Sequence, residues 1–292
     1  MYRIFHFLFL LGIGLLPFLS ISQTAMDSTF KSFRELSLHA KSDVEKTNYS
    51  DSLRLAVKKF MNSPGSFDTP LGKIPYIGDI YSPDNAFRMI TWNVSLKDET
   101  YDYYCFLQLA PNANGESQWH ELLDNHKNTR RPETKSLNKS EWFGSLYYSI
   151  IPFKKNKKTS YVLLGWEGNN KFSNKKILEC LSFNAKNEPR FDQTVFKSGR
   201  FNKRRVIFEY SKEAYFMLRY NEKLKMIVFN RLEPAKPELE GLYSYYQPTT
   251  TFDAYVLKKE EWIIEKDVDP RNTKNNKIFI DPSKKKNKPK ID

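Results

Sequence analysis

The sequence predicts a mainly β fold, an antiparallel meander that forms a propeller-like array or a sandwich, with an N-terminal helical segment. From Pro64 onward, short runs rich in Tyr, Phe, Ile, Val and Trp alternate with turn residues, which is typical of antiparallel strands. About a dozen such runs follow one another at hairpin spacing. Residues 23–63 instead carry apolar residues at helical spacing, so we expect this segment to be helical.

The helical segment has clear boundary signals. Ser42 precedes an apolar stripe, and Glu45 follows three residues later, which is the pattern of a capping box. The apolar positions of the stripe are Leu53, Val57, Phe60 and Met61. The run 62–65, Asn-Ser-Pro-Gly, predicts the end of the helix. A one-sided stripe of this kind indicates that the helix packs against the rest of the domain.

The β region divides into alternating runs separated by turn sequences such as Gly-Asn-Asn at 168–170. The predicted strands are 87–94, 101–109, 118–123, 142–153, 160–166, 176–183, 191–196, 205–210, 214–220, 225–230, 252–257 and 261–265. Their sequential order favours hairpins between chain neighbours, and hence a meander.

A weak internal repeat favours separate sheets that resemble propeller blades. Trp92 precedes Cys105 by 13 residues, and Trp166 precedes Cys180 by 14 residues, with a polar turn between them in both cases. The two tryptophans would then lie at matching strand ends, and the two cysteines on different sheets. Equivalent positions on separate sheets exceed the Cα separation of about 7 Å that a disulfide allows. Free thiols are therefore favoured over a disulfide.

The first 22 residues resemble an export signal. Arg3 is their only charge, an apolar run covers residues 5–19, and Ser-Ile-Ser at 20–22 supplies the small residues that a signal peptidase reads. The run is shorter than the roughly 20 residues of a bilayer span. We expect cleavage between Ser22 and Gln23; an uncleaved N-terminal anchor is the alternative.

Charge is concentrated at the C-terminal end. The formal net charge is +13, of which residues 271–292 supply +6 and Arg3 supplies +1. The body is therefore only mildly basic, and no nucleic-acid partner is expected. The predicted organisation is a signal peptide at 1–22, a helical segment at 23–63, a β-rich domain at 64–270 and a Lys-rich disordered tail at 271–292. Such a tail solubilises the chain or contacts anionic lipid or polysaccharide.

No catalytic motif emerges from the residues. His120, Asp124 and His126 approach a zincin pattern, but the second histidine falls two residues late and no third ligand is evident. Carboxylate pairs at 98–99 and 238–240 lie in polar stretches typical of solvated loops. The sequence has no Gly-rich phosphate loop and no nucleophile elbow. No catalytic residue, metal or cofactor is therefore expected.

Three tyrosines are the best binding candidates that the sequence offers. Tyr243, Tyr245 and Tyr246 follow a loop that contains two prolines and a glycine. Exposed tyrosines on a loop stack on sugar rings or anchor a protein partner. The alternative is that their rings fold back over the core.

Several stretches carry a family resemblance. They are SPDNAFRMITWNV, YVLLGWEGNNKFSNKKILECLSF, RRVIFEYSKEAYFMLRYNEKLKMIVF and EGLYSYYQPTTTFDAYVLKKEEWIIEKDVD. Together they resemble a family of exported envelope proteins from Gram-negative bacteria that has no assigned activity, over about residues 40–270. The resemblance implies an envelope location and transfers no catalytic residue.

These observations lead to one expected function and one alternative. The chain is expected to be a non-catalytic binding or structural component of the bacterial envelope. Its expected partners are an envelope polymer, an anionic lipid or another envelope protein. The alternative is an unrecognised hydrolase that acts on envelope polymer or glycan.

The first prediction concerns processing. Protein recovered from its native host should have an intact mass that begins at Gln23, with or without cyclisation of the glutamine, because the 20–22 tripeptide fits a signal peptidase site. A mass that retains residues 1–22 would contradict this prediction and favour the anchor.

Overall fold

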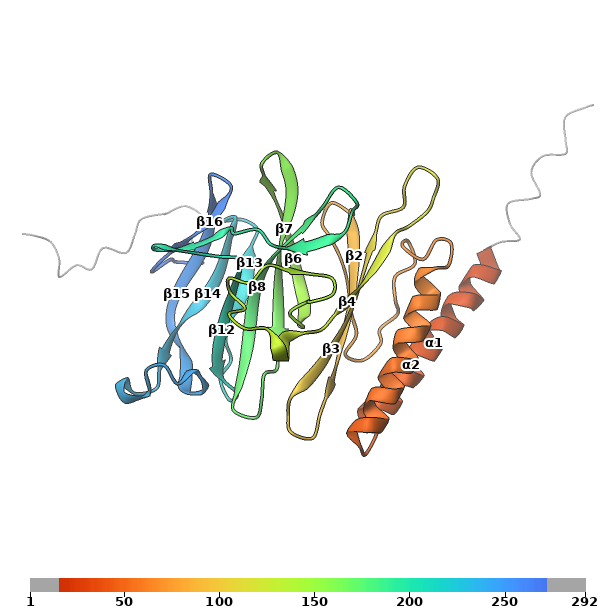
Figure 1. Cartoon of the computed structure of the whole chain (residues 1–292), viewed down its shortest axis with the longest axis horizontal. Helices are drawn as coiled ribbons and strands as arrows, with labels where there is room; N and C mark the ends of the chain where they lie inside the picture. The colour runs from red at the N-terminus through yellow and green to blue at the C-terminus, as the bar shows by residue number, and fades with distance from the viewer. Residues whose placement is uncertain (1–15, 272–292) are drawn as a thin grey trace, which may run out of the picture.

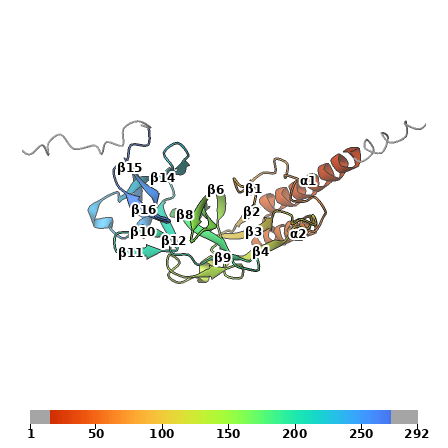
Figure 2. The same ribbon diagram turned by 90° about the horizontal axis from the view of Figure 1, so that it is seen from above.

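The computed structural model describes residues 16–271, with side chains from residue 25 on. Two helices, α1 (Leu16–His39) and α2 (Asp43–Met61), precede three β-sheets. Figures 1 and 2 show the helix pair, the first sheet, the second sheet and the third sheet in this order along the long axis. The predicted mainly β architecture with an N-terminal helical segment is confirmed.

The three sheets are built mostly from hairpins between chain neighbours. The first has the order β1 (Gly78–Tyr81), β2 (Phe87–Ser95), β3 (Tyr101–Leu109), β4 (Trp119–Leu123). The second has the order β5 (Leu137–Asn138), β9 (Pro189–Phe191), β8 (Ser173–Phe183), β7 (Lys158–Glu167), β6 (Leu146–Lys155), and β12 (Arg205–Ser211) also pairs with β8. The third has the order β11 (Phe201–Lys203), β10 (Phe196–Ser198), β16 (Glu261–Glu265), β15 (Tyr246–Lys258), β14 (Met226–Pro234), β13 (Leu218–Asn221).

The helix pair covers the outer face of the first sheet. Ser42 and Glu45 form the predicted capping box, and Asn62 caps the other end of α2. The predicted stripe is buried and packs with Trp92 of β2, whose indole Nε1 donates a hydrogen bond of 2.7 Å to Ser50 Oγ on α2. This buried polar anchor satisfies the indole N–H and fixes the helix on the sheet.

The sheets share two further apolar layers. On β7, Leu163 packs toward the first sheet, whereas its neighbours Val162 and Leu164 pack toward the third. This follows from the strand period of two residues, which sends successive side chains to opposite faces. The strands of the second sheet therefore contain runs of consecutive buried residues instead of a clean polar–apolar alternation.

The two cysteines lie on different sheets, as the sequence predicts. Cys105 on β3 is part of the layer between the first and second sheets, and Cys180 on β8 belongs to the layer between the second and third. Both are buried free thiols. The expectation of matching strand ends for the tryptophans is wrong, because Trp92 lies inside β2 opposite Tyr104, whereas Trp166 is next to the end of β7.

Other differences from the predicted strands have local causes. The run 191–196 is not one strand: β9 ends in the second sheet and β10 begins in the third, where it pairs with β16 in the parallel direction. Residues 142–145 precede β6, and Trp142 makes only an isolated bridge with Asp124. Strands β1, β5 and β11 are not among the predicted strands. Each has four residues or fewer, and such short strands are defined by their partners.

The predicted signal peptide and the predicted Lys-rich tail lie at the two ends of the chain, and the structure describes only part of them. Helix α1 begins at Leu16, so it contains the Ser22–Gln23 junction. Residues 1–15 of the predicted signal and 272–292 of the predicted tail lie outside the described residues. Cleavage and the Lys-rich tail stay predictions. Within residues 16–271, neither helix is long and apolar enough to cross a bilayer.

The second prediction concerns the thiols. Burial raises the pKa of both Cys105 and Cys180, so the native protein should react slowly with a thiol reagent at neutral pH. After denaturation without reductant, both should label. A protein that labels only after reduction would contradict the placement of the two residues on separate sheets.

Candidate functional site

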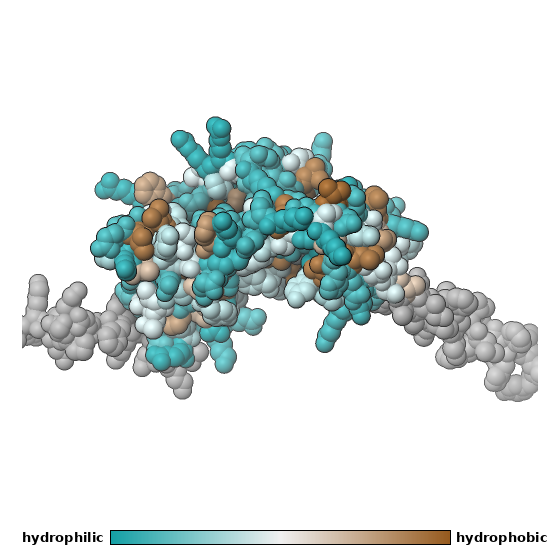
Figure 3. Space-filling view, turned by 90° about the horizontal axis from the view of Figure 1, so that it is seen from below, coloured by the Kyte–Doolittle hydropathy of each residue, from teal (hydrophilic) through white to brown (hydrophobic). Residues whose placement is uncertain are grey.

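Loops at one end of the sheets bring lysines and aromatic rings together on the surface. These loops lie at the lower end of β8 in Figure 1, and Figure 3 views the molecule from that side, where hydrophilic residues lie beside pale and hydrophobic ones. We call this surface the basic-aromatic rim. Its residues are Tyr101, Tyr148, Lys171, Phe172, Lys176, Lys212 and Tyr215.

Lys176 occupies the centre of the basic-aromatic rim. It lies on β8, two residues before Leu178 and hence on the face that packs toward the third sheet. Its Nζ lies 5.4 Å from the ring centroid of Tyr148 and 6.0 Å from that of Tyr215. Tyr148 is the extra residue of a bulge in β6, and its hydroxyl donates to the carbonyl of Leu218 on β13. The ammonium group is therefore held at the open junction of two sheets.

Two more lysine–aromatic pairs extend the basic-aromatic rim. Lys171 Nζ lies 4.8 Å from the ring of Phe172 in the β7–β8 loop. Lys212 Nζ lies 5.7 Å from the ring of Tyr101 on β3 and donates to the carbonyl of Asn170 at 3.0 Å. The pairs therefore continue toward the first sheet, and the rings offer exposed faces, with Phe172 61% and Tyr215 85% exposed.

Lys176 differs from Lys175 and Lys212, which pair with Glu167 at 3.2 Å and Glu99 at 3.9 Å, because it has no anionic partner among residues 16–271. Among residues 16–271 it makes no hydrogen bond or ion pair, and only the two rings contact its charge. Burial lowers its pKa. The acidic groups of the paired strand β12 and the turn after it are engaged or exposed: Glu209 accepts from Ser173 Oγ at 2.7 Å, and Glu213 is exposed in the turn before Tyr215.

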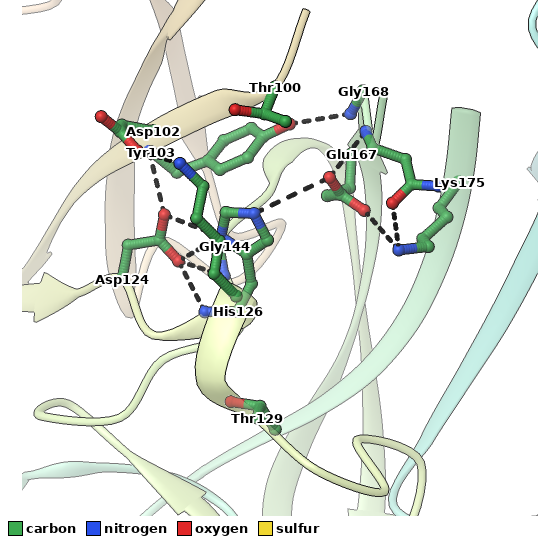
Figure 4. A network of polar contacts seen from close by, with 12 residues as sticks. Thr100, Asp102, Tyr103, Asp124, His126, Thr129, Gly144, Glu167, Gly168 and Lys175 are labelled. Carbon is green, nitrogen blue, oxygen red and sulfur yellow. Dashed lines mark hydrogen bonds and ion pairs between the residues drawn. The ribbon is translucent and has the colours of Figure 1, made fainter. Parts of the chain in front are cut away.

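A buried polar network holds the β7–β8 loop that carries Phe172 (Figure 4). The side chain of Glu167 is fully buried; its Oε1 accepts from the backbone N–H of Asn169 at 2.7 Å, and its Oε2 lies 3.2 Å from Lys175 Nζ. Lys175 donates in turn to Asn169 Oδ1 at 2.6 Å. Asn170 Oδ1 accepts from the backbone N–H of Phe172 at 2.8 Å, which closes the turn. The exposed ring is thus presented by an ordered loop.

His126 continues this network toward the first sheet. Its Nδ1 lies 2.8 Å from Asp124 Oδ1, and its Nε2 lies 4.0 Å from Glu167 Oε1. Asp124 also accepts from the backbone N–H groups of Tyr103 and Gly144. Because both carboxylates are engaged by protein donors and the imidazole is nearly buried, the cluster ties three segments together and presents no reactive group to solvent.

Gly168 joins the two sheets at closest approach. Its N–H donates to the Tyr103 hydroxyl at 2.8 Å, and a Cβ at this position would collide with the Tyr101 ring and lie 2.7 Å from Trp166. Only glycine therefore lets the loop pass beneath the aromatic rings that support Lys212.

The tyrosines predicted from sequence belong to a separate loop, which lies against β8 and β12. Tyr243 and Tyr245 lie in the short 3-10 helix η3 (Tyr243–Tyr245) of the β14–β15 connection and are 53% and 51% exposed. The Tyr246 ring lies 5.0 Å from that of Tyr243, and its hydroxyl accepts from the N–H of Gly241. Tyr243 and Tyr245 are therefore turned to solvent, and this loop stays a second candidate surface.

The histidine-containing segment is a strand followed by a loop. His120 lies on β4 and contacts the carbonyl of Asn187 through Nε2 at 2.9 Å, whereas Asp124 lies after the strand end and binds His126. Burial lowers the pKa of His120. The structure therefore separates the His120 and Asp124 side chains, and within the described chain no group of three metal-ligating side chains converges.

A second buried cluster lies inside the second sheet. Arg205 on β12 pairs with Glu179 on β8, and the hydroxyl of Tyr147 donates to Glu179 Oε2 at 2.5 Å. The side chains of Arg205 and Glu179 are fully inaccessible, and Trp142 Nε1 donates to the Tyr147 hydroxyl. Such a pair is costly to break because one buried charge would remain uncompensated.

A groove of about 550 Å³ lies between the helices. Met26, Phe30 and Phe60 supply much of its apolar wall, and Lys59 is the one charged residue of its lining. It therefore brings no pair of titratable groups together for acid–base chemistry.

Comparison with protein-family models, with curated proteins and with solved structures finds no match. The site therefore rests on its own geometry. The basic-aromatic rim is not evident in the sequence because its members come from four segments of the chain. The adjacent Lys171 and Phe172 beside the Gly-Asn-Asn turn were the available signal.

The third prediction tests the packing beneath the basic-aromatic rim. Gly168→Ala should lower the free energy of unfolding by about 1–3 kcal/mol, since the added methyl group overpacks against the Tyr101 ring. In a Tyr101→Ala background the same substitution should cost less, because the ring is gone. Equal costs in both backgrounds, measured by denaturant unfolding, would show that the two residues are not coupled.

Proposed function

We propose that this chain is a non-catalytic binding component of the bacterial envelope that holds an anionic envelope polymer on the basic-aromatic rim. The observation that carries the proposal is Lys176, a half-buried ammonium group between two exposed aromatic rings and without an anionic partner in residues 16–271. The predicted export signal and the resemblance to exported proteins support the envelope location.

The chemistry of the basic-aromatic rim supports a polymer as the ligand. Four lysine–aromatic pairs, made by three lysines, follow the ends of the sheets, so one extended ligand can contact several of them. Tyrosine and phenylalanine rings supply contact area at low entropic cost, and lysines supply attraction to negative charge. The predicted Lys-rich tail would add to this attraction.

The hydrolase alternative has less support. Asp124 and Glu167 converge on the nearly buried His126 and are occupied by backbone N–H groups and Lys175. Asp253 and Asp267 converge on Arg231, which is paired with both. A glycosidase needs two carboxyl groups that flank an accessible bond.

The fourth prediction tests the surface with matched ring deletions. The double variant Phe172→Ala/Tyr215→Ala removes two exposed rings of the basic-aromatic rim. We expect it to reduce co-sedimentation of the purified chain with envelope fragments of a Gram-negative bacterium about tenfold, because stacked rings supply much of the contact area.

The control is Tyr76→Ala/Phe201→Ala, which removes one tyrosine and one phenylalanine that are each 73% exposed elsewhere on the chain. It should bind like the wild type. Equal losses in the two double variants, or no sedimentation of the wild type, would contradict the proposal. Steady release of soluble sugar fragments would favour the hydrolase.

A further inference from the structure

We infer that Lys176 recognises the carboxylate of an acidic sugar unit, and that the ligand of the basic-aromatic rim is a carboxylated polysaccharide. This inference rests on the proposed function and names the chemical class of its ligand. The geometry that carries it is the position of the ammonium group, 5.4 Å from the ring centroid of Tyr148 and 6.0 Å from that of Tyr215, so that two apolar ring faces lie beside a single positive charge.

Leaving Lys176 unpaired has a cost in free energy. A half-buried ammonium loses part of its hydration, and the aromatic rings replace only some of it. A neighbouring protein carboxylate would restore the balance, as Glu167 does for Lys175 at 3.2 Å. For Lys176 the described residues supply none, so an anion from outside the chain is the group that completes the site.

The second step concerns the kind of anion. Phosphate sites commonly combine several donors, such as arginine forks or the N–H groups at a helix N-terminus. Lys176 sits on a strand whose backbone groups are paired with β7 and β12, so it offers one point charge. The single positive charge of one ammonium group matches the single negative charge of one carboxylate.

The third step concerns the body that carries the carboxylate. The Tyr215 side chain is 85% exposed and Tyr148 42% exposed, and their rings stand beside the ammonium group. A pyranose ring has an apolar face that stacks on such rings, while its hydroxyl groups stay in water. A carboxylate on the same pyranose ring then reaches the ammonium group of Lys176.

The test uses polygalacturonate as the probe and methyl-esterified polygalacturonate as its uncharged counterpart. The full chain should bind the acidic polymer and lose binding to the esterified one. Lys176→Gln should weaken binding about tenfold. Lys186→Gln is the control, since it removes the same charge from an exposed position in the turn after β8, at the opposite end of that strand.

Each outcome decides a point. Equal affinity of Lys176→Gln and Lys186→Gln, with wild-type thermal stability in both, would overturn the role of Lys176. In that case the proposed function would stand if the ring-deletion variant Phe172→Ala/Tyr215→Ala bound envelope fragments more weakly than the wild type. Tighter Lys176-dependent binding of polyphosphate or of anionic vesicles would overturn the carboxylate and favour a phosphate or a lipid headgroup. If the wild-type chain bound neither polygalacturonate nor envelope fragments, both proposals would be overturned.

A pH profile gives an independent readout. The burial that lowers the pKa of Lys176 means that its positive charge is lost at a lower pH than that of an ordinary lysine. Wild-type binding should therefore weaken on the alkaline side earlier than the residual binding of Lys176→Gln. Profiles of the same shape would contradict the assignment.

Discussion

The burial of both faces of the first two sheets is the constraint on which the rest of the structure depends. The first sheet lies between the helix pair and the second sheet, and the second lies between the first and the third. A large apolar side chain contributes about 1.5–3 kcal/mol when it is removed from water. Three shared layers therefore hold the array together. They also leave only loops, strand ends and outer surfaces to meet a ligand.

Buried polar clusters fix the positions of the strands and sheets relative to one another. The pair of Arg205 and Glu179 connects β12 to β8, and Asp124, His126 and Glu167 connect the first sheet to the second. Charged groups inside a protein must be paired to be tolerated, so each cluster favours one arrangement of its strands. The same cluster orders the β7–β8 loop, which presents Phe172 and Lys171 at the surface. Structural and functional roles thus meet in that loop.

Local patterns predict much of this fold from sequence. The capping box at Ser42, the stripe on α2 and the long strands β2, β3, β7 and β8 all follow from spacing and composition. The change of sheet between β9 and β10 does not, because a strand's partner is a property of the assembled chain. Arg88 shows the same limit. This residue of the predicted strand 87–94 is buried and donates to the carbonyls of Ser66 and Thr69, which lie in a distant part of the sequence.

The candidate surface was less predictable than the fold. Tyr148 comes from a bulge, Lys176 from a strand, and Tyr215 from a turn, so only the folded chain brings them together. The tyrosines at 243–246 were visible because they are neighbours in sequence. Candidate residues that are adjacent in sequence are easier to recognise than residues that only the fold brings together. Adjacency in sequence, however, does not indicate whether the residues complement the charge of a ligand.

Hydrogen–deuterium exchange of the full chain with and without polygalacturonate tests the central claim most directly. Bound polymer restricts solvent access and local opening where it contacts the backbone. The account predicts increased protection in residues 168–176 and 211–217, with the β14–β15 connection unchanged. Protection confined to residues 242–246, or none anywhere, would contradict the assignment of the basic-aromatic rim as the binding surface.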